Sequence, residues 1–286
     1  MQNKTSKFDN LGLDTTKMLW YDKAIKGTAK TLCTMKGESE MTKKEIYAAH
    51  GIEYKAGKIL YHGQWIAELL KEGNSKTGKR VYTWSMTPGK EGTCICDCEG
   101  CYAKTGFFQM PNVKKTLALN TSIVNEDINF FYRAVSAQLE TIGAGEVRIH
   151  AAGDFKTNNP DAYANTWHRI VKENPSFLFW TYTKMTRFET LFDDLPNGNI
   201  VKSVIDGIGF NFGHCDYIIN TYRKLQAMGA NVYICRCGID KNQHCENCGH
   251  CGKAQFVLFI EHSTAYKAEQ DPRFEELKAL IENQAE

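Results

Sequence analysis

Nine of the eleven cysteines fall into two groups whose spacing could bind metal. The first group lies within eight residues and consists of Cys94, Cys96, Cys98 and Cys101. Taken as Cys94, Cys98 and Cys101, the spacing C-x3-C-x2-C lets three thiolates bind one face of a four-iron cluster and leaves the fourth iron open. Zinc is the alternative, because four soft thiolates could complete a tetrahedral site. Adjacent C-x-C pairs strain a single-zinc chelate, so the spacing favours iron–sulfur, with Cys96 as an extra thiol that could replace one of the three.

The second group lies near the C-terminal end and contains Cys235, Cys237, Cys245, Cys248 and Cys251. Its last three members form C-x2-C-x2-C, which is typical of ferredoxins that take a fourth thiolate from elsewhere in the chain, here Cys235 or Cys237. Zinc is a stronger alternative at this group, since His244 and His250 lie beside the thiols and a knuckle would stabilise the loop. A third alternative is one cluster shared by both groups.

Composition limits the class of protein. The chain has 286 residues, 42% of them hydrophobic, which is enough to bury a sizeable core. Its net charge of +2 gives no general field that would attract a polyanion. No apolar run is long enough for a membrane span or a signal peptide, so we expect a cytoplasmic protein with reduced thiols. Isolated Cys33 and Cys215 are then expected to be small buried hydrophobic residues.

Alternating elements predict the fold that positions these thiols. Strands are expected at 81–86, 147–152, 177–183, 200–205, 232–235 and 256–261. Helices are expected at 42–50, 125–141, 159–172, near 188, at 216–228 and at 271–284. This alternation favours a parallel sheet with crossover helices, and we expect an α/β fold with a partial (β/α)6-type barrel. Functional groups should gather at the carboxyl ends of the strands, where both cysteine groups and Gly153-Asp154 fall.

These motifs resemble two related kinds of protein. The Cys94, Cys98, Cys101 spacing after a first strand resembles the signature loop of radical SAM enzymes, in which S-adenosylmethionine chelates the open iron. The segments 93–103 and 148–155, with the late cysteine triplet, are more closely similar to the phage gene-product-88 family, itself similar to radical SAM proteins. The resemblance covers roughly residues 80–262. It implies a [4Fe–4S] cluster, or two, and a 5′-deoxyadenosyl radical generated from S-adenosylmethionine.

The resemblance also implies roles for three other residues. Gly153 and Asp154 are similar to the segment that binds the amino group of S-adenosylmethionine, with Asp154 as acceptor and Gly153 allowing close backbone approach. The alternative is an ordinary Gly-Asp turn. The signature has an aromatic residue before its last cysteine, whereas this chain has Gly100 there and Tyr102 just after. His150 is expected to be a core residue, and Lys184 and Asp206 are expected at the rim.

The sequence thus predicts an N-terminal extension (1–79), an α/β barrel with both cysteine groups (80–262) and a C-terminal helix (263–286). The leading hypothesis is a radical-SAM-like iron–sulfur protein that receives electrons from a flavodoxin- or ferredoxin-like donor, in the host cytoplasm if phage-encoded. The alternative is a non-catalytic phage protein, either an iron–sulfur protein or one stabilised by zinc at the C-terminal cysteines, with a structural, electron-transfer or nucleic-acid-binding role. For nucleic acid, the candidate contacts are Lys43, Lys44, Lys55 and Lys58 with Tyr47, Tyr54 and Tyr61.

Overall fold

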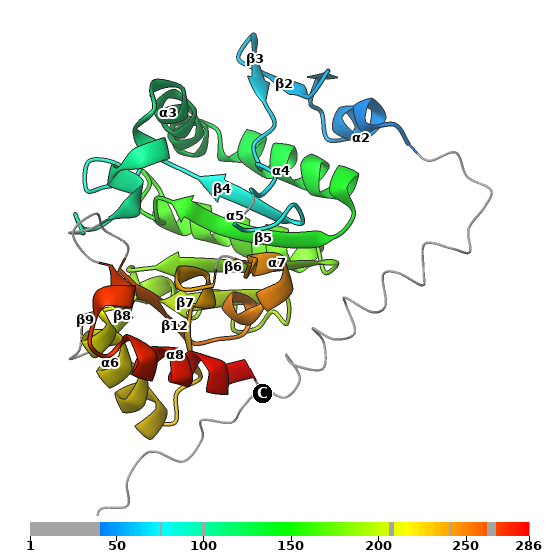
Figure 1. Cartoon of the computed structure of the whole chain (residues 1–286). Coiled ribbons are helices and arrows are strands. Elements are labelled where there is room, and N and C mark those ends of the chain that lie inside the picture. Colours follow the sequence, from blue (N-terminus) through cyan, green and yellow to red (C-terminus); the bar gives the residue numbers. More distant parts are fainter. Residues whose placement is uncertain are drawn as a thin grey trace, which may run out of the picture.

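The computed structural model describes residues 41–74, 76–98, 101–205, 209–240, 242–261 and 267–285 (Figure 1). The expectations for Cys33, Gly100 and Asp206 lie outside the described residues. None of the helices in these ranges is both long enough and apolar enough to cross a bilayer.

A parallel sheet forms the centre of the molecule, and all six predicted strands are present. They are β4 (Val81–Ser85), β5 (Gly145–Ala152), β6 (Phe177–Thr183), β7 (Gly198–Lys202), β11 (Val232–Ile234) and β12 (Phe256–Ile260). Their pairings are parallel throughout, as where Arg148 of β5 lies opposite Trp180 of β6. The sheet curls into a half-barrel with alternating helices, which confirms the predicted partial barrel.

The order of the strands reverses at one edge of the sheet. β4, β5, β6 and β7 are neighbours in chain order, but β12 pairs with β7 and β11 pairs with the outer side of β12. The short strand β10 (Phe212–Gly213) also pairs with β12. A separate pair is formed by β8 (Val204–Ile205) and β9 (Gly209–Phe210). The connection from β11 to β12 therefore runs back toward β7. Since crossovers are right-handed, connections that run in opposite directions lie on opposite faces of a sheet.

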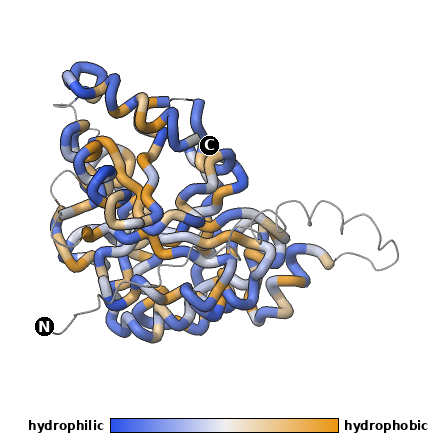
Figure 2. Tube along the Cα trace, turned by 90° about the horizontal axis from the view of Figure 1, so that it is seen from below, coloured by the Kyte–Doolittle hydropathy of each residue, from blue (hydrophilic) through white to orange (hydrophobic). Residues whose placement is uncertain are grey.

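Helices cover the convex face of the half-barrel. They are α3 (Pro111–Glu126), α4 (Ile128–Ile142), α5 (Pro160–Glu173), α6 (Cys215–Ala227) and α8 (Phe274–Glu282). The side chains of Asp127 and Asn159 cap α4 and α5 by accepting from backbone N–H groups in the first turn. Figure 2 shows hydrophobic residues along the central strands and hydrophilic residues along the outer sides of the helices. Val147 and Ile149 of β5 belong to this core, so their neighbours Glu146 and Arg148 face the concave side.

The N-terminal segment contains a small antiparallel sheet that was not predicted. The predicted first helix is α2 (Lys43–Ala49), with Thr42 and Glu45 forming a capping box. It is followed by β1 (Tyr54–Lys55), β2 (Lys58–Tyr61) and β3 (Gln64–Ala67), which pair in that order. Ile59 and Ile66 are buried in the main core, so this sheet packs onto the half-barrel.

Candidate functional site at two cysteine groups

The Cys94–Cys101 loop begins directly after β4, at the carboxyl end of the parallel strands. Its start is folded back on itself, because Thr93 N donates to Thr87 O (2.9 Å) and Cys94 N donates to Gly89 O (3.2 Å). Gly89 has a φ of +88°, which suits glycine at this turn. The loop thus projects its thiols at the mouth of the half-barrel, where the sequence predicts a site.

Thr93 ties this loop to the end of β5. Asp154 N donates to Thr93 Oγ1 (3.2 Å), and Lys156 N donates to Thr93 O (3.1 Å). Gly153 has a φ of +92°, and a Cβ there would lie 2.5 Å from Thr93 Oγ1. The space beside Gly153, which the sequence assigned to S-adenosylmethionine, is thus occupied by the side chain of Thr93.

Asp154 is a buried carboxylate that connects three segments. Only 5% of the residue is exposed, and Oδ1 accepts from Thr183 Oγ1 (2.7 Å) and Phe155 N (2.8 Å). Oδ2 accepts from Lys184 N (3.0 Å) at the end of β6. Burial raises the pKa of Asp154, against the opposing effect of these donors. A carboxylate has about four acceptor positions, and these three donors occupy three of them.

The thiols of the first group lie close to one another and to this carboxylate. The Sγ atoms of Cys96 and Cys98 are 3.3 Å apart. Burial raises the pKa of Cys94 and of Cys96 to about 11, and both thiols lie within electrostatic reach of the Lys184 ammonium. At neutral pH these thiols are protonated, so a bound metal ion would have to displace their protons.

Tyr102 attaches the end of the loop to β5. It begins the short helix η1 (Tyr102–Lys104), and its hydroxyl donates to Ala151 O. The same hydroxyl accepts from Arg148 Nη2 (3.1 Å). The residue is 55% exposed at the mouth beside Cys101, and its ring contacts that of Phe108 edge-on.

The second cysteine group lies on the concave face of the sheet. It occupies the connection from β11 to β12, which carries the short helices α7 (Cys245–Cys248) and η5 (His250–Gly252) and in Figure 1 crosses in front of β6 and β7. A Cβ at Gly252 would lie 2.4 Å from Leu178 Cδ2, and Asn199 Nδ2 donates to Cys251 O (2.8 Å). The group was expected at the strand ends; the structure shows that the segment extends from the end of β11 across the sheet.

Five sulfurs gather on this face. The thiol of Cys237 donates to Gln243 O (3.5 Å) and lies within electrostatic reach of Cys235 and Cys245, and Cys251 lies within electrostatic reach of Cys245 and Cys248. The neighbouring thiol of Cys235 raises the pKa of Cys237 to about 12, and burial raises that of Cys251 to about 12.

Two tyrosines contact the second cysteine group from the sheet. Tyr182 Oη donates to Cys251 Sγ (2.8 Å), and Cys248 Sγ lies 3.8 Å from Tyr233 Oη. The His250 ring stacks on Tyr233 with centroids 3.7 Å apart. Soft donors and polar groups thus converge here.

Buried polar atoms without hydrogen bonds also concentrate around the second cysteine group. Among the described residues eight such atoms occur, and four of them belong to Glu146, Arg148, Arg236 and His244. Each unpaired buried polar atom costs about 1–3 kcal/mol. Arg148 and Glu146 lie within electrostatic reach of Cys245, and Arg236 within reach of Cys248. Charged side chains thus surround these thiols, and no three His, Cys, Asp or Glu in the described ranges have the close arrangement of a metal site.

Two residues behave as the core groups expected from the sequence. Cys215, the first residue of α6, is fully buried in the core. His150 is 3% exposed, and its ring nitrogens contact Thr181 Oγ1 (3.1 Å) and Tyr163 Oη (2.9 Å). It has a φ of +58° at an irregularity in the β4–β5 pairing, which no sequence signal indicated.

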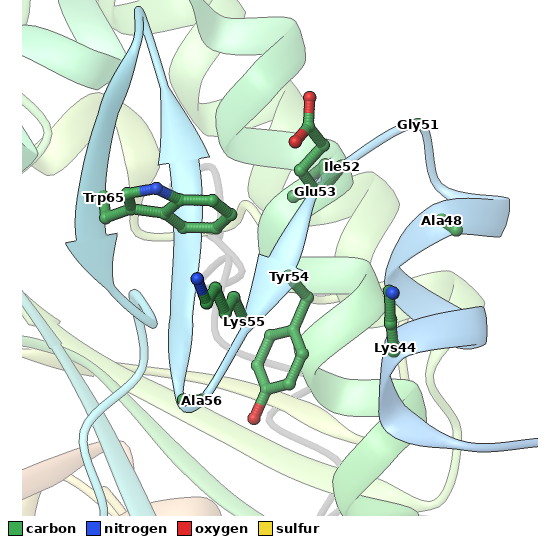
Figure 3. Close-up of a pocket in the computed structure, with 9 residues that line it drawn as sticks. All are labelled: Lys44, Ala48, Gly51, Ile52, Glu53, Tyr54, Lys55, Ala56 and Trp65. Atoms are coloured by element: carbon green, nitrogen blue, oxygen red, sulfur yellow. The ribbon is translucent and has the colours of Figure 1, made fainter.

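A groove of about 760 Å³ lies on the N-terminal sheet, away from both cysteine groups. Figure 3 shows Trp65 of β3 and Lys44 of α2 on opposite sides of it, with Tyr54 and Lys55 between them. Trp65 is 42% exposed, and sequence reasoning missed it. Of the tyrosines considered for nucleic-acid contact, two are core residues: Tyr47 and Tyr61.

Comparison with known proteins places this fold and loop in a family. A family model described as gene product 88 matches residues 40–209, and the chain belongs to this family. The match includes the Cys94–Cys101 loop and Gly153-Asp154 and ends before the second cysteine group. Neither a curated protein nor a solved structure matches the chain.

Proposed function

We propose that this protein is an iron–sulfur protein resembling radical SAM enzymes. In this proposal Cys94, Cys98 and Cys101 hold a [4Fe–4S] cluster, with Cys96 as an alternative ligand, and the second cysteine group holds an auxiliary cluster. The observation that carries the proposal is the anchoring of the Cys94–Cys101 loop, after the first strand of a parallel half-barrel, to Gly153 and Asp154 after the second. This arrangement brings soft thiols and a buried carboxylate to one mouth.

In this proposal, different residues at the mouth bind different parts of S-adenosylmethionine. The fourth acceptor position of Asp154 would take an ammonium group, and the exposed residue Tyr102 would offer its aromatic side chain to an adenine. When bound, the cluster and S-adenosylmethionine supply one-electron reductive cleavage of the cofactor. The fold contributes shielding and orientation, and a flavodoxin- or ferredoxin-like protein would supply the electron.

The proposal is tested on full-length protein purified without oxygen. Iron, sulfide and zinc are quantified per chain, and 5′-deoxyadenosine is measured after reduction with S-adenosylmethionine present. Iron with sulfide and release of 5′-deoxyadenosine are expected. Iron without release would favour a non-catalytic iron–sulfur protein, and a colourless protein with stoichiometric zinc would favour the zinc-stabilised alternative.

Single cysteine variants assign the metal to each group. Cys98→Ala and Cys248→Ala should each lower the iron content by about four atoms per chain, because each removes a ligand from a different cluster. Cys215→Ala is the matched control, since this thiol is buried outside both groups and iron should stay at the wild-type amount. Full iron in either of the first two variants would argue against that residue as a ligand.

The groove around Trp65 favours a second candidate function, the binding of single-stranded nucleic acid. An exposed indole on one side of a groove that also contains Lys44 and Lys55 offers stacking together with attraction to phosphate. Stacking of one base contributes about 1–3 kcal/mol, so Trp65→Ala should weaken binding of a short oligothymidine about 5- to 150-fold. Fluorescence anisotropy with Met228→Ala as the exposed apolar control measures this. Equal affinity of Trp65→Ala and wild type would remove the groove from consideration.

A further inference from the structure

Exposed aromatic residues lie at two separate places along the carboxyl edge of the parallel sheet. After β4, Phe107 of the short helix η2 (Gly106–Gln109) is 65% exposed, the highest value for a large hydrophobic residue in the described ranges. Its ring contacts that of Phe108 edge-on, with centroids 6.1 Å apart. After β7, Phe210 of β9 is 38% exposed, and its ring stacks on that of Phe212 with centroids 6.0 Å apart. A neighbouring ring thus holds each exposed ring in place.

Three lysines connect these two places, because one follows each of the strands β4, β5 and β6. They are Lys90, Lys156 and Lys184. Lys184 Nζ lies 5.5 Å from the centre of the Phe210 ring, and Lys184 N donates to Asp154 Oδ2 (3.0 Å). Two residues after Asp154, Lys156 Nζ donates to Lys90 O (2.5 Å). The lysines therefore follow the carboxyl edge from β6 to β4.

The positive charge of these lysines is not neutralised by ion pairs. In the part of the chain that the structure describes, none of the three ammonium groups forms one. Lys104, by contrast, pairs with Asp97 (3.0 Å). Asp154 lies within electrostatic reach of Lys184, but it is buried and accepts hydrogen bonds from three other donors. Unpaired cations at an exposed edge attract an anionic partner.

The arrangement of these residues favours one kind of anion. Lysine is depleted in protein–protein interfaces, which argues against an acidic protein. A lipid surface is bound by one continuous apolar face, whereas here Phe107 and Phe210 are separated by cations. Aromatic rings that stack bases, with lysines that contact phosphates between them, are typical of proteins that bind single-stranded nucleic acid.

We propose that the carboxyl edge binds a single strand of nucleic acid, with bases stacked on Phe107 and Phe210 and phosphates contacted by Lys90, Lys156 and Lys184. These contacts do not read base identity, so the binding tolerates different sequences. A bound strand would pass over the Cys94–Cys101 loop. Its binding requires no metal, whereas a role for it as the substrate rests on the proposed function.

The test measures the affinity of full-length protein, purified without oxygen, for a short fluorescent oligothymidine. Anisotropy is recorded in a Trp65→Ala background, so that the groove on the N-terminal sheet makes no contribution. Phe107→Ala and Phe210→Ala should each weaken binding about 5- to 150-fold, the usual effect of removing a ring on which a base stacks. Met228→Ala is the exposed apolar control and should bind with the affinity of the background protein.

Salt dependence tests the three lysines. Combining Lys90→Gln, Lys156→Gln and Lys184→Gln should lower the slope of log affinity against log salt by about 2, since each phosphate contact contributes about 0.7. Lys278→Gln replaces an exposed lysine of α8 and should leave the slope unchanged. An unchanged slope in the triple variant would overturn the proposed phosphate contacts.

Photocrosslinking of wild-type protein to an oligonucleotide that contains 5-iodouracil locates the bases without any variant. Crosslinks in peptides that contain Phe107 or Phe210 are expected, and crosslinks at Trp65 alone would overturn the proposal. Two further results would overturn it: displacement of the strand by polyglutamate, which has charge but no bases, as effectively as by oligothymidine, and binding to vesicles of anionic phospholipid without binding to the strand.

The same preparation is assayed for release of 5′-deoxyadenosine, so that the two proposals fail separately. Release without strand binding at the carboxyl edge would contradict this inference alone. Strand binding there without release would support this inference and contradict the proposed radical chemistry.

Discussion

Asp154→Ala should lower the free energy of unfolding by about 3–5 kcal/mol, because it leaves several buried donors without an acceptor. These donors are Thr183 Oγ1 and the backbone N–H groups of Phe155 and Lys184. The effect should appear in urea denaturation of reduced protein treated with chelator, where metal makes no contribution. It would show that Asp154 holds the ends of β5 and β6 together whether or not it also contacts a cofactor.

Two further variants serve as comparisons for Asp154→Ala, one at the same position and one at an exposed aspartate. Asp154→Asn keeps one acceptor oxygen but points an amide N–H₂ toward donors, so a smaller loss of about 1–3 kcal/mol is expected. Asp193→Ala removes an exposed carboxylate and should change stability by less than about 0.5 kcal/mol. Equal stability of Asp154→Ala and wild type would contradict the claim that the Asp154 carboxylate holds the ends of β5 and β6 together.

His150→Asn should make the protein less stable at neutral pH and less sensitive to acid. Burial lowers the pKa of His150 to about 3, whereas an exposed histidine titrates near 6.5. As the pH falls below about 6.5, the unfolded chain binds a proton that the folded chain does not, so acid favours unfolding. Wild type should therefore lose about 1.4 kcal/mol per pH unit from this group between about pH 6 and pH 4.

The variant separates this titration from the loss of hydrogen bonds. Asparagine tolerates the positive φ at this position, and its loss of the Tyr163 contact should cost about 1–2 kcal/mol at pH 7. The stability curves of variant and wild type should converge as the pH falls and cross near pH ~5, where the wild type has lost about as much as the variant lacks at pH 7. Thr181→Val removes a hydroxyl partner of His150 but no titrating group. Its free energy of unfolding should therefore be lower than that of wild type by the same amount at every pH. Parallel curves for His150→Asn and wild type would refute a neutral buried histidine.

Local sequence patterns were sufficient for the central sheet and for the place of the first cysteine group after β4. Apolar runs such as 177–183 are long enough to identify β6, and their alternation with helices favours the half-barrel that is observed. The N-terminal sheet escaped prediction because its strands have only 2–4 residues, too few for a period-two pattern to emerge. The exposure of Trp65 depends on that sheet and was missed with it.

The parts that could not be predicted depend on contacts between distant residues. Nothing around Asp154 in sequence indicates that Thr183 and Lys184, about 30 residues later, donate to it. The position of β12 between β7 and β11 likewise depends on which strands pair with each other, and the local sequence pattern does not determine that pairing. That pairing places the second cysteine group on the concave face and brings Arg148 beside it.

The strand reversal also determines how small molecules can approach the Cys94–Cys101 loop. The segment from β11 to β12 packs against Leu178 and Asn199 from the concave side, while α4 and α5 cover the convex side. Both faces of the sheet are thus covered at β6, and the carboxyl edge is the direction of entry that these contacts leave. A reactant would reach the thiols end-on, so selection among reactants would depend on the loops that surround this edge.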